Sequence, residues 1–271
     1  MSAAPFSNNT FSENPVSASA IIVAGGSGVR MKGPTRKQYL PLQKRPILSR
    51  ALSVFENCER INRIYLVVPE EDFVYVRANI LCHSKGEKET VLVPGGKERQ
   101  NSVCNGVRAV DARETYVVVH DGVRPFVTSE DIESCLDGVR FSGACILGLP
   151  AKETLKRVEK INGKIFIQGT IDREEIWHAQ TPQAFRRDLL KKAHEQARAE
   201  AWLGTDDASL LELAGVKVRI VPGKSFNIKI TTPEDLVLAE NILSSKAWKF
   251  QSLSENGFSS RTELESGEEE F

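Results

Sequence analysis

Residues 21–40, IIVAGGSGVRMKGPTRKQYL, indicate both a fold and a place for phosphate groups. The stretch begins within a short apolar run, residues 20–24, which is typical of a buried strand in a parallel sheet. Gly25, Gly26 and Gly28 follow, and glycines let the backbone turn its N–H groups into a concavity that binds anions. Cationic side chains come next, at Arg30, Lys32, Arg36 and Lys37. We therefore predict a strand that ends in a loop holding several phosphates.

The spacing of this loop differs from the two commonest phosphate-binding motifs. A Gly-x-Gly-x-x-Gly dinucleotide motif starting at Gly26 would need a third glycine where this chain has Met31. The Gly-x-x-x-x-Gly-Lys-Ser/Thr pattern of a P-loop does not occur either. The alternative is a glycine turn whose cationic side chains are merely solvated. Gly33 and Pro34 weigh against it, because they keep the cationic run from forming an ordinary exposed helix face.

Composition limits the classes of function. Basic and acidic side chains number 36 each, so the formal net charge is zero and a nonspecific nucleic-acid binder is not expected. No apolar run reaches the length that spans a membrane, so no membrane partner is expected. The five cysteines are widely spaced, with no Cys-x-x-Cys pair. This pattern is typical of reduced thiols in a cytoplasmic protein, and not of a disulfide framework or a zinc site.

The two ends of the chain differ in composition from its middle. Residues 1–18 are rich in Ser, Asn and Pro and hold no Lys or Arg, so we expect a disordered extension and not a secretory signal. Residues 246–271 are polar and end in three glutamates and a phenylalanine, which favours a second disordered end. One domain is therefore predicted over residues 19–245.

Strand-like and helical segments alternate in the first half of that domain. β-branched runs at 64–68, 90–93, 116–119 and 144–149 are separated by helical patterns at 46–55, 73–80, 99–110 and 129–140. This alternation predicts an α/β fold, a mostly parallel sheet with helices on both faces. Such sheets bind ligands at the carboxyl ends of their strands. The polar motifs at 25–37, 95–102 and 120–125 all fall there.

Residues 152–183 interrupt the alternation. Patterns of period two at 153–159 and 164–171 flank Asn162-Gly163, the strongest short signal for a β-hairpin. We expect a projecting arm over about residues 152–176. Because a two-stranded ribbon is marginal alone, the arm is expected to pack against a second subunit.

After the arm, helical patterns resume at 184–202 and 206–214. Strands are predicted at 216–221 and 227–231. Pro233 is expected to begin a final helix, with Thr232 as its cap.

The motif HDGVRP at 120–125 follows the strand predicted at 116–119. An aspartate at a strand end beside a phosphate loop is a natural ligand for Mg²⁺ on a nucleotide, so Asp121 is the candidate metal ligand. Arg124 suits a bidentate contact with phosphate. In the alternative, Asp121 caps the next turn and pairs with Arg124. His120 is expected to make a structural hydrogen bond and not to act as an acid or a base.

Eight short motifs occur in order between residues 20 and 243, at 24–31, 37–40, 95–103, 120–125, 170–173, 177–183, 205–209 and 227–236. Each is modest alone, but together they resemble the 2-C-methyl-D-erythritol 4-phosphate cytidylyltransferases of isoprenoid biosynthesis. The resemblance leaves only the two tails uncovered. It implies a Rossmann-like nucleotidyltransferase fold whose projecting β-hairpin arm interlocks a homodimer.

The resemblance implies a reaction and roles for particular residues. A cytidylyl group passes from CTP to 2-C-methyl-D-erythritol 4-phosphate, pyrophosphate is released, and Mg²⁺ takes part. Arg30 and Lys37 would bind the triphosphate, Lys229 would contact the α-phosphate, and Asp121 would help to hold the metal. Nucleotide binding is expected from Ala24, Gly25, Gly26, Gly28, Gly95, Gly96 and Ser102. The sugar-alcohol phosphate is expected to meet Asp121, Arg124, Thr154, Arg173 and Thr181, with Thr154 and Arg173 reaching across to the neighbouring subunit.

Several alternatives stay open at this point. Gly95-Gly96 is also consistent with a plain turn, and Thr154 with ordinary hydrogen bonding on a strand. Ribitol 5-phosphate cytidylyltransferase is a competing activity, although residues 177–182 favour the methylerythritol branch. A non-catalytic nucleotide-binding homologue is a third reading, opposed by the intact set Arg30, Lys37, Asp121 and Lys229.

Two positions depart from the family's usual pattern. Arg36 stands directly before Lys37, where relatives usually have proline, and Lys97 stands where they often have an acidic residue. The phosphate loop is therefore expected to be less rigid, with Arg36 as an extra candidate phosphate ligand.

Overall fold

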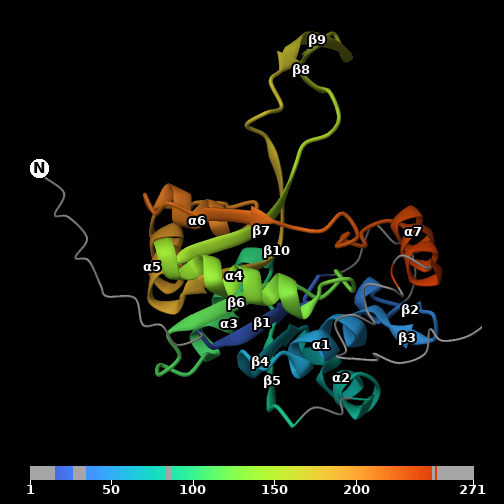
Figure 1. Cartoon of the computed structure of the whole chain (residues 1–271), viewed down its shortest axis with the longest axis vertical. Helices are drawn as coiled ribbons and strands as arrows, with labels where there is room; N and C mark the ends of the chain where they lie inside the picture. Colours follow the sequence, from blue (N-terminus) through green and yellow to red (C-terminus); the bar gives the residue numbers. More distant parts are fainter. Residues whose placement is uncertain (1–15, 27–34, 84–86, 246–247, 249–271) are drawn as a thin grey trace, which may run out of the picture.

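A seven-stranded sheet forms the centre of the computed structural model, which describes residues 16–26, 35–83, 87–245 and 248 (Figure 1). The strand order is β11-β7-β10-β6-β1-β4-β5. The strands are β1 (Ala18–Val23), β4 (Ile61–Val68), β5 (Thr90–Pro94), β6 (Tyr116–Asp121), β7 (Ala144–Pro150), β10 (Trp177–Arg186) and β11 (Arg219–Pro222). Only β10 among these runs antiparallel to its neighbours, β6 and β7. The predicted mostly parallel α/β sheet is confirmed.

Strand β10 corrects one sequence prediction. The helix expected at 184–202 begins later, as α5 (Arg187–Ala199), because residues 184–186 still belong to β10. Ala184 pairs with Val118 of β6 on one side and with Cys145 of β7 on the other. Backbone hydrogen bonds on both sides and complete burial of Ala184 and Phe185 outweigh the local helical pattern.

Helices cover both faces of the sheet. The first core cluster joins it to α1 (Ile47–Asn57), α2 (Phe73–Asn79) and α4 (Ser129–Ser142). The second joins the opposite face to α3 (Arg99–Ala109), α5 and α6 (Asp207–Leu213). Along β1, Ala20 and Ile22 belong to the first cluster, whereas Ile21 and Val23 belong to the second. Burial on both faces explains why this strand is a continuous apolar run.

A third cluster supports the carboxyl-end loops. It joins β2 (Pro41–Leu42), which pairs with β3 (Arg45–Pro46), to α7 (Pro233–Ser244). In the same cluster Trp248 packs edge-on against Phe126, with ring centroids 5.0 Å apart. Thr232 caps α7 as predicted, since its hydroxyl accepts the Asp235 N–H.

The strand predicted at 227–231 is wrong. That segment is a loop, in which Ile230 N–H donates to the Val123 carbonyl.

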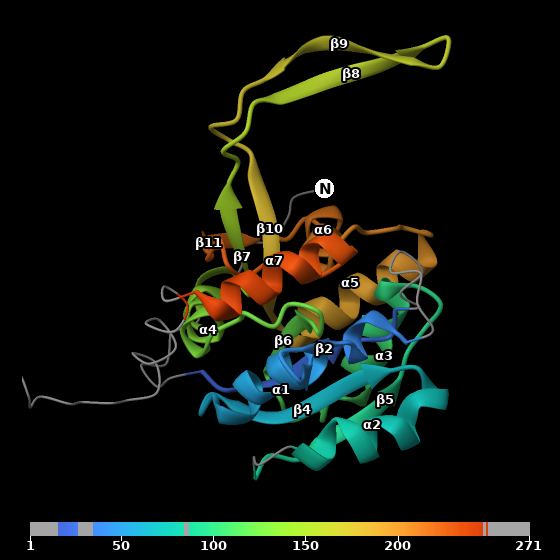
Figure 2. The ribbon, with the colours of Figure 1, turned by 90° about the vertical axis from the view of Figure 1, so that its right-hand side faces the viewer.

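The arm projects away from the sheet, as Figure 2 shows. Its strands β8 (Leu155–Ile161) and β9 (Lys164–Ile171) form a separate antiparallel sheet. Asn162 and Gly163 between them have φ of 49° and 76°, the left-handed pair that a tight hairpin turn requires. The predicted hairpin is therefore confirmed. The described residues also form three single-turn helices, η2 (Lys37–Tyr39), η3 (Glu70–Asp72) and η4 (Leu81–His83). Across the described ranges, no helix is both long and apolar enough to cross a membrane.

Candidate active site

A cavity of about 680 Å³ opens where β1, β4, β5 and β6 end. Three segments that are far apart in the sequence meet there, as their positions at strand ends predict. The lining includes the glycine loop after β1, the glycine loop after β5 and the last residue of β6, with charged side chains between them. These are Ala24, Gly25, Gly26, Lys37, Gly95, Gly96, Lys97, Arg99, Ser102, Asp121 and Lys229.

The two glycine loops approach each other closely. A Cβ atom on Gly25 would lie 3.2 Å from Ser102 Oγ and 3.6 Å from Gly95 Cα, and one on Gly96 would lie 2.4 Å from Asn101 Cβ. Ser102 is buried, and its hydroxyl accepts the Gly96 N–H at 2.9 Å and donates to the Glu98 carbonyl at 3.1 Å. One wall of the cavity is thus bare backbone, held in shape by Ser102.

Lys37 is placed beside this wall by its neighbour Gln38. The buried Gln38 amide donates to the Ala24 carbonyl at 2.7 Å, which ties η2 to the end of β1. Arg36, the predicted extra phosphate ligand, also lines the cavity. Its guanidinium lies 2.6 Å from Glu71 and 2.9 Å from Asp72. The residue before Lys37 is therefore tied to the loop that follows β4.

Asp121 forms the charged floor of the cavity. Its Oδ1 accepts from Arg99 Nε at 2.9 Å, its Oδ2 lies 2.8 Å from Lys229 Nζ, and Arg124 Nε is 3.6 Å from Oδ2. Burial alone would raise the pKa of Asp121, but the charges of Arg99, Lys229 and Arg124 outweigh it and hold that pKa well below its usual range. The carboxylate is ionised throughout the physiological range.

His120 and Thr181 lie behind Asp121. The Thr181 hydroxyl accepts the Asp121 N–H at 3.1 Å and lies 3.0 Å from His120 Nδ1, while His120 Nε2 lies 3.1 Å from the Arg124 carbonyl. Because that carbonyl can only accept, Nε2 carries the proton and Nδ1 accepts from Thr181. Burial lowers the pKa of His120 to about 4, so the ring is neutral. His120 makes the structural hydrogen bonds expected of it.

The other predicted site residues fall into three groups. Gly28 and Arg30 lie outside the described residues. Thr154 and Arg173 are exposed at the base of the arm, just outside β8 and β9 and not on the strands as expected. The Arg173 guanidinium donates to the Lys152 carbonyl. Arg124 donates to the Asn227 carbonyl at 2.7 Å and, like Thr181, borders Asp121 without lining the cavity.

Sequence reasoning missed Arg99 and Asp207. Arg99 is the first residue of α3 and lines the cavity, where its guanidinium bridges Asp121 and Asp207 at 2.9 Å and 2.8 Å. Both residues lie within the motifs at 95–103 and 205–209, but the motifs alone indicate no role for either. An arginine that begins a helix directly after a glycine loop was the available signal for Arg99.

The donor set fits a magnesium ion carried by a nucleotide. Among the described residues, no group of three or more His, Cys, Asp or Glu side chains converges on a metal site. Mg²⁺ in nucleotide sites is commonly held by one or two carboxylates plus substrate phosphates. Each carboxylate oxygen has two acceptor positions. Asp121 therefore keeps room for such an ion beside Arg99 and Lys229.

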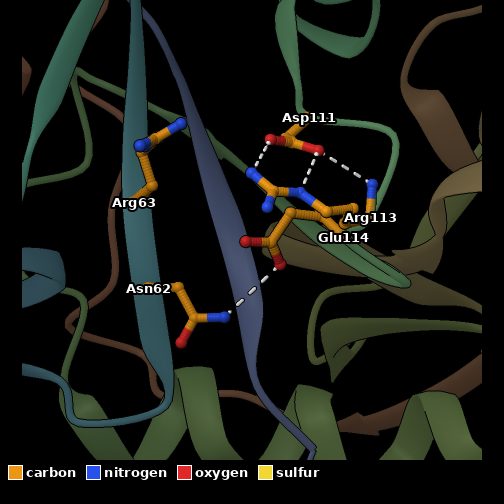
Figure 3. Close-up of a pocket in the computed structure, with 5 residues that line it drawn as sticks. All are labelled: Asn62, Arg63, Asp111, Arg113 and Glu114. Carbon is orange, nitrogen blue, oxygen red and sulfur yellow. Dashed lines mark hydrogen bonds and ion pairs between the residues drawn. The ribbon is translucent and has the colours of Figure 1, made fainter.

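A second pocket, of about 390 Å³, lies at the opposite end of the strands, near the amino ends of β4 and β6 (Figure 3). The charged side chains that line this pocket pair with one another or with close neighbours. Arg113 lies 2.7 Å from Asp111, Arg63 lies 2.6 Å from Glu89, and the Asn62 amide donates to Glu114. The cavity over Asp121 is therefore the stronger candidate for an active site.

A bare-backbone wall and cations around an ionised aspartate, at the carboxyl ends of a parallel sheet, suit the phosphates of a nucleoside triphosphate. Together they define the nucleotidyltransferase class. Within that class, the chain belongs to the 2-C-methyl-D-erythritol 4-phosphate cytidylyltransferase family, whose model, described as IspD, matches residues 18–245. The family predicted from the sequence motifs is confirmed, and the chain is a transferase.

Curated proteins of the same family are similar to this chain over most of its length. The 2-C-methyl-D-erythritol 4-phosphate cytidylyltransferase of Syntrophus aciditrophicus is 46% identical over 224 residues, which cover 83% of this chain and 94% of that protein. The Bacillus licheniformis protein of the same name is 45% identical, over 82% of this chain and 94% of its own.

Solved structures agree with the fold. The 4-diphosphocytidyl-2C-methyl-D-erythritol synthase of Anaerococcus prevotii has a TM-score of 0.74 at 32% identity, covering 85% of this chain and 97% of that one. The Thermus thermophilus 2-C-methyl-D-erythritol 4-phosphate cytidylyltransferase has a TM-score of 0.69 at 30% identity, covering 85% and 100%. The predicted Rossmann-like nucleotidyltransferase fold is confirmed.

Proposed function

We propose that this chain transfers a cytidylyl group from CTP to 2-C-methyl-D-erythritol 4-phosphate, with Asp121 and its surrounding cations at the reaction centre. A phosphate oxygen of the sugar-alcohol phosphate forms a bond to the α-phosphorus of CTP. The bond from that phosphorus to the β-phosphate oxygen breaks, and pyrophosphate leaves with the electron pair. The observation that carries the proposal is the cavity in which Lys229 and Arg99 hold the two oxygens of Asp121.

The catalytic work is positioning and charge stabilisation, as is usual in phosphoryl transfer. Lys37 binds the triphosphate and stabilises the charge on the leaving pyrophosphate. Lys229, whose side chain is 36% exposed, contacts the α-phosphate from the Asp121 side of the cavity. Arg30 assists Lys37, a role that rests on the family resemblance alone.

The bare wall selects the base. With no side chains at Gly25 and Gly95, backbone groups approach the edge of a pyrimidine, and a larger purine does not fit the narrow gap. Ala24, Gly26, Gly28 and Gly96 belong to the same surface, and Ser102 fixes its shape.

Asp121 would hold Mg²⁺ together with phosphate oxygens of the nucleotide. When bound, the ion supplies positive charge that neutralises the triphosphate. Because three neighbouring cations already keep the carboxylate ionised, no proton has to leave Asp121 for the metal to bind.

A homodimer completes the site. Ile165 and Ile167 on the arm are each 66% exposed, and exposed apolar side chains on a thin ribbon favour burial against a second copy of the chain. Thr154 and Arg173 at the base of the arm would then reach the sugar phosphate bound by the partner. Arg124 and Thr181 assist from behind Asp121.

The test measures pyrophosphate release with CTP and either 2-C-methyl-D-erythritol 4-phosphate or ribitol 5-phosphate. The proposal expects turnover that depends on the methylerythritol compound. Preference for ribitol 5-phosphate would support the competing activity, and nucleotide binding without turnover would support a non-catalytic homologue.

A cytoplasmic location, expected from the cysteine pattern, belongs to the same proposal.

A further inference from the structure

Asp207 is a fully buried carboxylate that does not line the cavity. It is the first residue of α6, with no exposed surface, and its Oδ2 accepts from Arg99 Nη1 at 2.8 Å. Through Nε the same guanidinium donates to Asp121 Oδ1 at 2.9 Å. A continuous chain of charges therefore runs from the interior to the cavity floor, in the order Asp207, Arg99, Asp121 and Lys229.

The loop that carries Asp207 is fixed from two other elements. On β10, the Gln183 amide donates to Asp206 at 2.7 Å and its carbonyl oxygen accepts the Ala208 N–H at 3.3 Å. On α3, Gln100 donates to the Trp202 carbonyl at 3.1 Å and accepts the Gly204 N–H at 3.0 Å. These bonds leave Asp207 little freedom to move relative to Arg99.

Arg99 is the charge partner of Asp207. A carboxylate taken out of water is strongly destabilising unless it is paired. The other titratable group facing it is His194, whose Nε2 lies 3.8 Å from Asp207 Oδ1. Burial lowers the pKa of His194, so this ring stays neutral near pH 7. Asp207 Oδ1 has no hydrogen-bond partner in the described part of the chain, so the Arg99 contact carries the pairing.

Because the Arg99 guanidinium donates to a carboxylate on each side, Asp121 and Asp207, it has one orientation. Its donors form a rigid planar fork, so the bond to Asp207 fixes which donor meets Asp121. Asp121 Oδ1 is then always occupied by Arg99, and Oδ2 is left facing Lys229 and the cavity.

We infer that Asp207 is a positioning residue for cytidylyl transfer: it orients Arg99, which orients the Asp121 carboxylate at the reaction centre. This inference rests on the proposed function. It also gives the motif at 205–209 a role, although those residues lie outside the cavity lining.

The experiment is a double-mutant cycle with Asp207→Asn and Arg99→Gln, read in kcat and in the KM for CTP. Asp207→Asn keeps the shape of the side chain and removes its charge. We expect kcat to fall about 10- to 100-fold, the usual effect of losing the partner that orients a site ligand. The KM for CTP should change far less, because Asp207 touches no substrate. In the Arg99→Gln background the same substitution should lower kcat less than about threefold, because the residue through which it acts is gone.

The control is Asp137→Asn, which likewise replaces an aspartate by asparagine. Asp137 lies on α4, away from the cavity, and its carboxylate pairs with Arg60 at 2.8 Å. The kcat of this variant should stay within about twofold of wild type. If Asp207→Asn fails to fold, Asp207→Glu replaces it in the cycle, because it keeps the charge that pairs with Arg99 and moves the carboxylate by one methylene; the same loss of kcat is expected.

A loss of kcat on substituting Asp207 in the wild type, together with equal kcat in Arg99→Gln and the double variant, supports the inference. A further tenfold loss in the double variant, or wild-type kcat in Asp207→Asn, would overturn it. Absence of turnover in the wild type would instead count against the proposed function, so the two failures are distinguishable.

Discussion

Lys229 Nζ lies 2.8 Å from Asp121 Oδ2, although the two residues are more than 100 positions apart in the sequence. Asp121 ends β6, while Lys229 sits in the loop before α7, which Ile230 pins to the Val123 carbonyl. The pair brings the partly exposed Lys229 ammonium and the buried Asp121 carboxylate together at one point of the cavity. In the proposed reaction an incoming phosphate competes with Asp121 for Lys229, and we therefore propose this contact as the position of the α-phosphate.

Removing either proposed catalytic lysine should affect turnover more than folding. Lys37→Ala and Lys229→Ala should each lower kcat by about 100-fold, since one preorganised charge contact is worth ~3 kcal/mol in the transition state. Initial rates of pyrophosphate release measure the effect. Lys191→Ala, which removes an exposed lysine near Glu195, is the charge-matched control and should leave kcat unchanged. Wild-type kcat in Lys37→Ala or Lys229→Ala would place the triphosphate elsewhere.

The enzyme should distinguish pyrimidine from purine triphosphates. A Cβ atom on Gly25 or Gly95 would have neighbouring protein atoms within 3.6 Å, so this wall is bare backbone, and we propose that its backbone groups contact the edge of a pyrimidine. CTP should therefore exceed ATP and GTP in kcat/KM by at least about 100-fold, since a base that does not fit loses several contacts at once. Competition assays with saturating sugar phosphate provide the measurement. Comparable turnover of ATP would mean that this wall does not contact the base.

Stability should fall as the pH drops from about 6.5 to about 4. Burial lowers the pKa of His120 to about 4 from an ordinary value of 6.5. In that window the unfolded chain binds a proton that the folded chain does not, so the free energy of unfolding decreases by up to ~1.4 kcal/mol per pH unit. His194, also lowered by burial, acts in the same direction. Asp121 contributes below its ordinary value of 3.8, because its folded pKa is depressed.

Urea unfolding at a series of pH values measures this slope. His120→Gln keeps a donor for the Arg124 carbonyl and removes the titration, so its unfolding free energy should depend less on pH across the interval from the lowered to the ordinary pKa of histidine. An unchanged slope in this variant would show that folding does not lower the pKa of His120.

Arg173 should act on the sugar phosphate and not on the nucleotide. Arg173→Ala should raise the KM for 2-C-methyl-D-erythritol 4-phosphate far more than the KM for CTP, because its side chain is at the base of the arm and away from the described cavity. Steady-state kinetics with each substrate varied in turn separate the two effects. An equal rise in both values would point to a structural role.

Mixing two impaired variants, assayed at a sugar-phosphate concentration well below the KM of Arg173→Ala, tests whether Arg173 acts across subunits. After random exchange, half of the dimers formed from Arg173→Ala and Lys37→Ala chains are mixed, and each mixed dimer holds one site with both residues intact. Activity should then recover to about a quarter of wild type, given two-fold pairing and independent sites. No recovery despite demonstrated exchange would assign Arg173 to its own subunit's site.

Local patterns predicted the fold where they agreed with the tertiary structure. A few adjacent residues were enough to predict the strand at residues 20–24 and the hairpin turn at Asn162-Gly163. Ala184 does not: its helical neighbourhood is overruled by pairing with Val118 and Cys145, partners that no local pattern reveals. The segment 227–231 is β-branched enough to suggest a strand, yet it packs against the loop around Val123 and joins no sheet.

The same distinction holds for the site. Strand ends and glycine spacing were sufficient to predict that Gly25, Gly95 and Asp121 converge. The link from Asp121 through Arg99 to Asp207 includes a contact, Arg99 to Asp207, between residues 108 positions apart. It depends on side-chain direction and complete burial, neither of which a single sequence displays.

Phosphorus NMR of the wild-type protein with CTP, Mg²⁺ and 2-C-methyl-D-erythritol 4-phosphate tests the central claim most directly, because it reports which phosphorus–oxygen bond breaks. Attack at the α-phosphorus beside Lys229 and Asp121 predicts equal growth of free pyrophosphate and of a new diphosphate diester, as CTP and the monophosphate disappear together. Release of orthophosphate with CDP, or an unchanged sugar-phosphate signal while CTP is consumed, would contradict it.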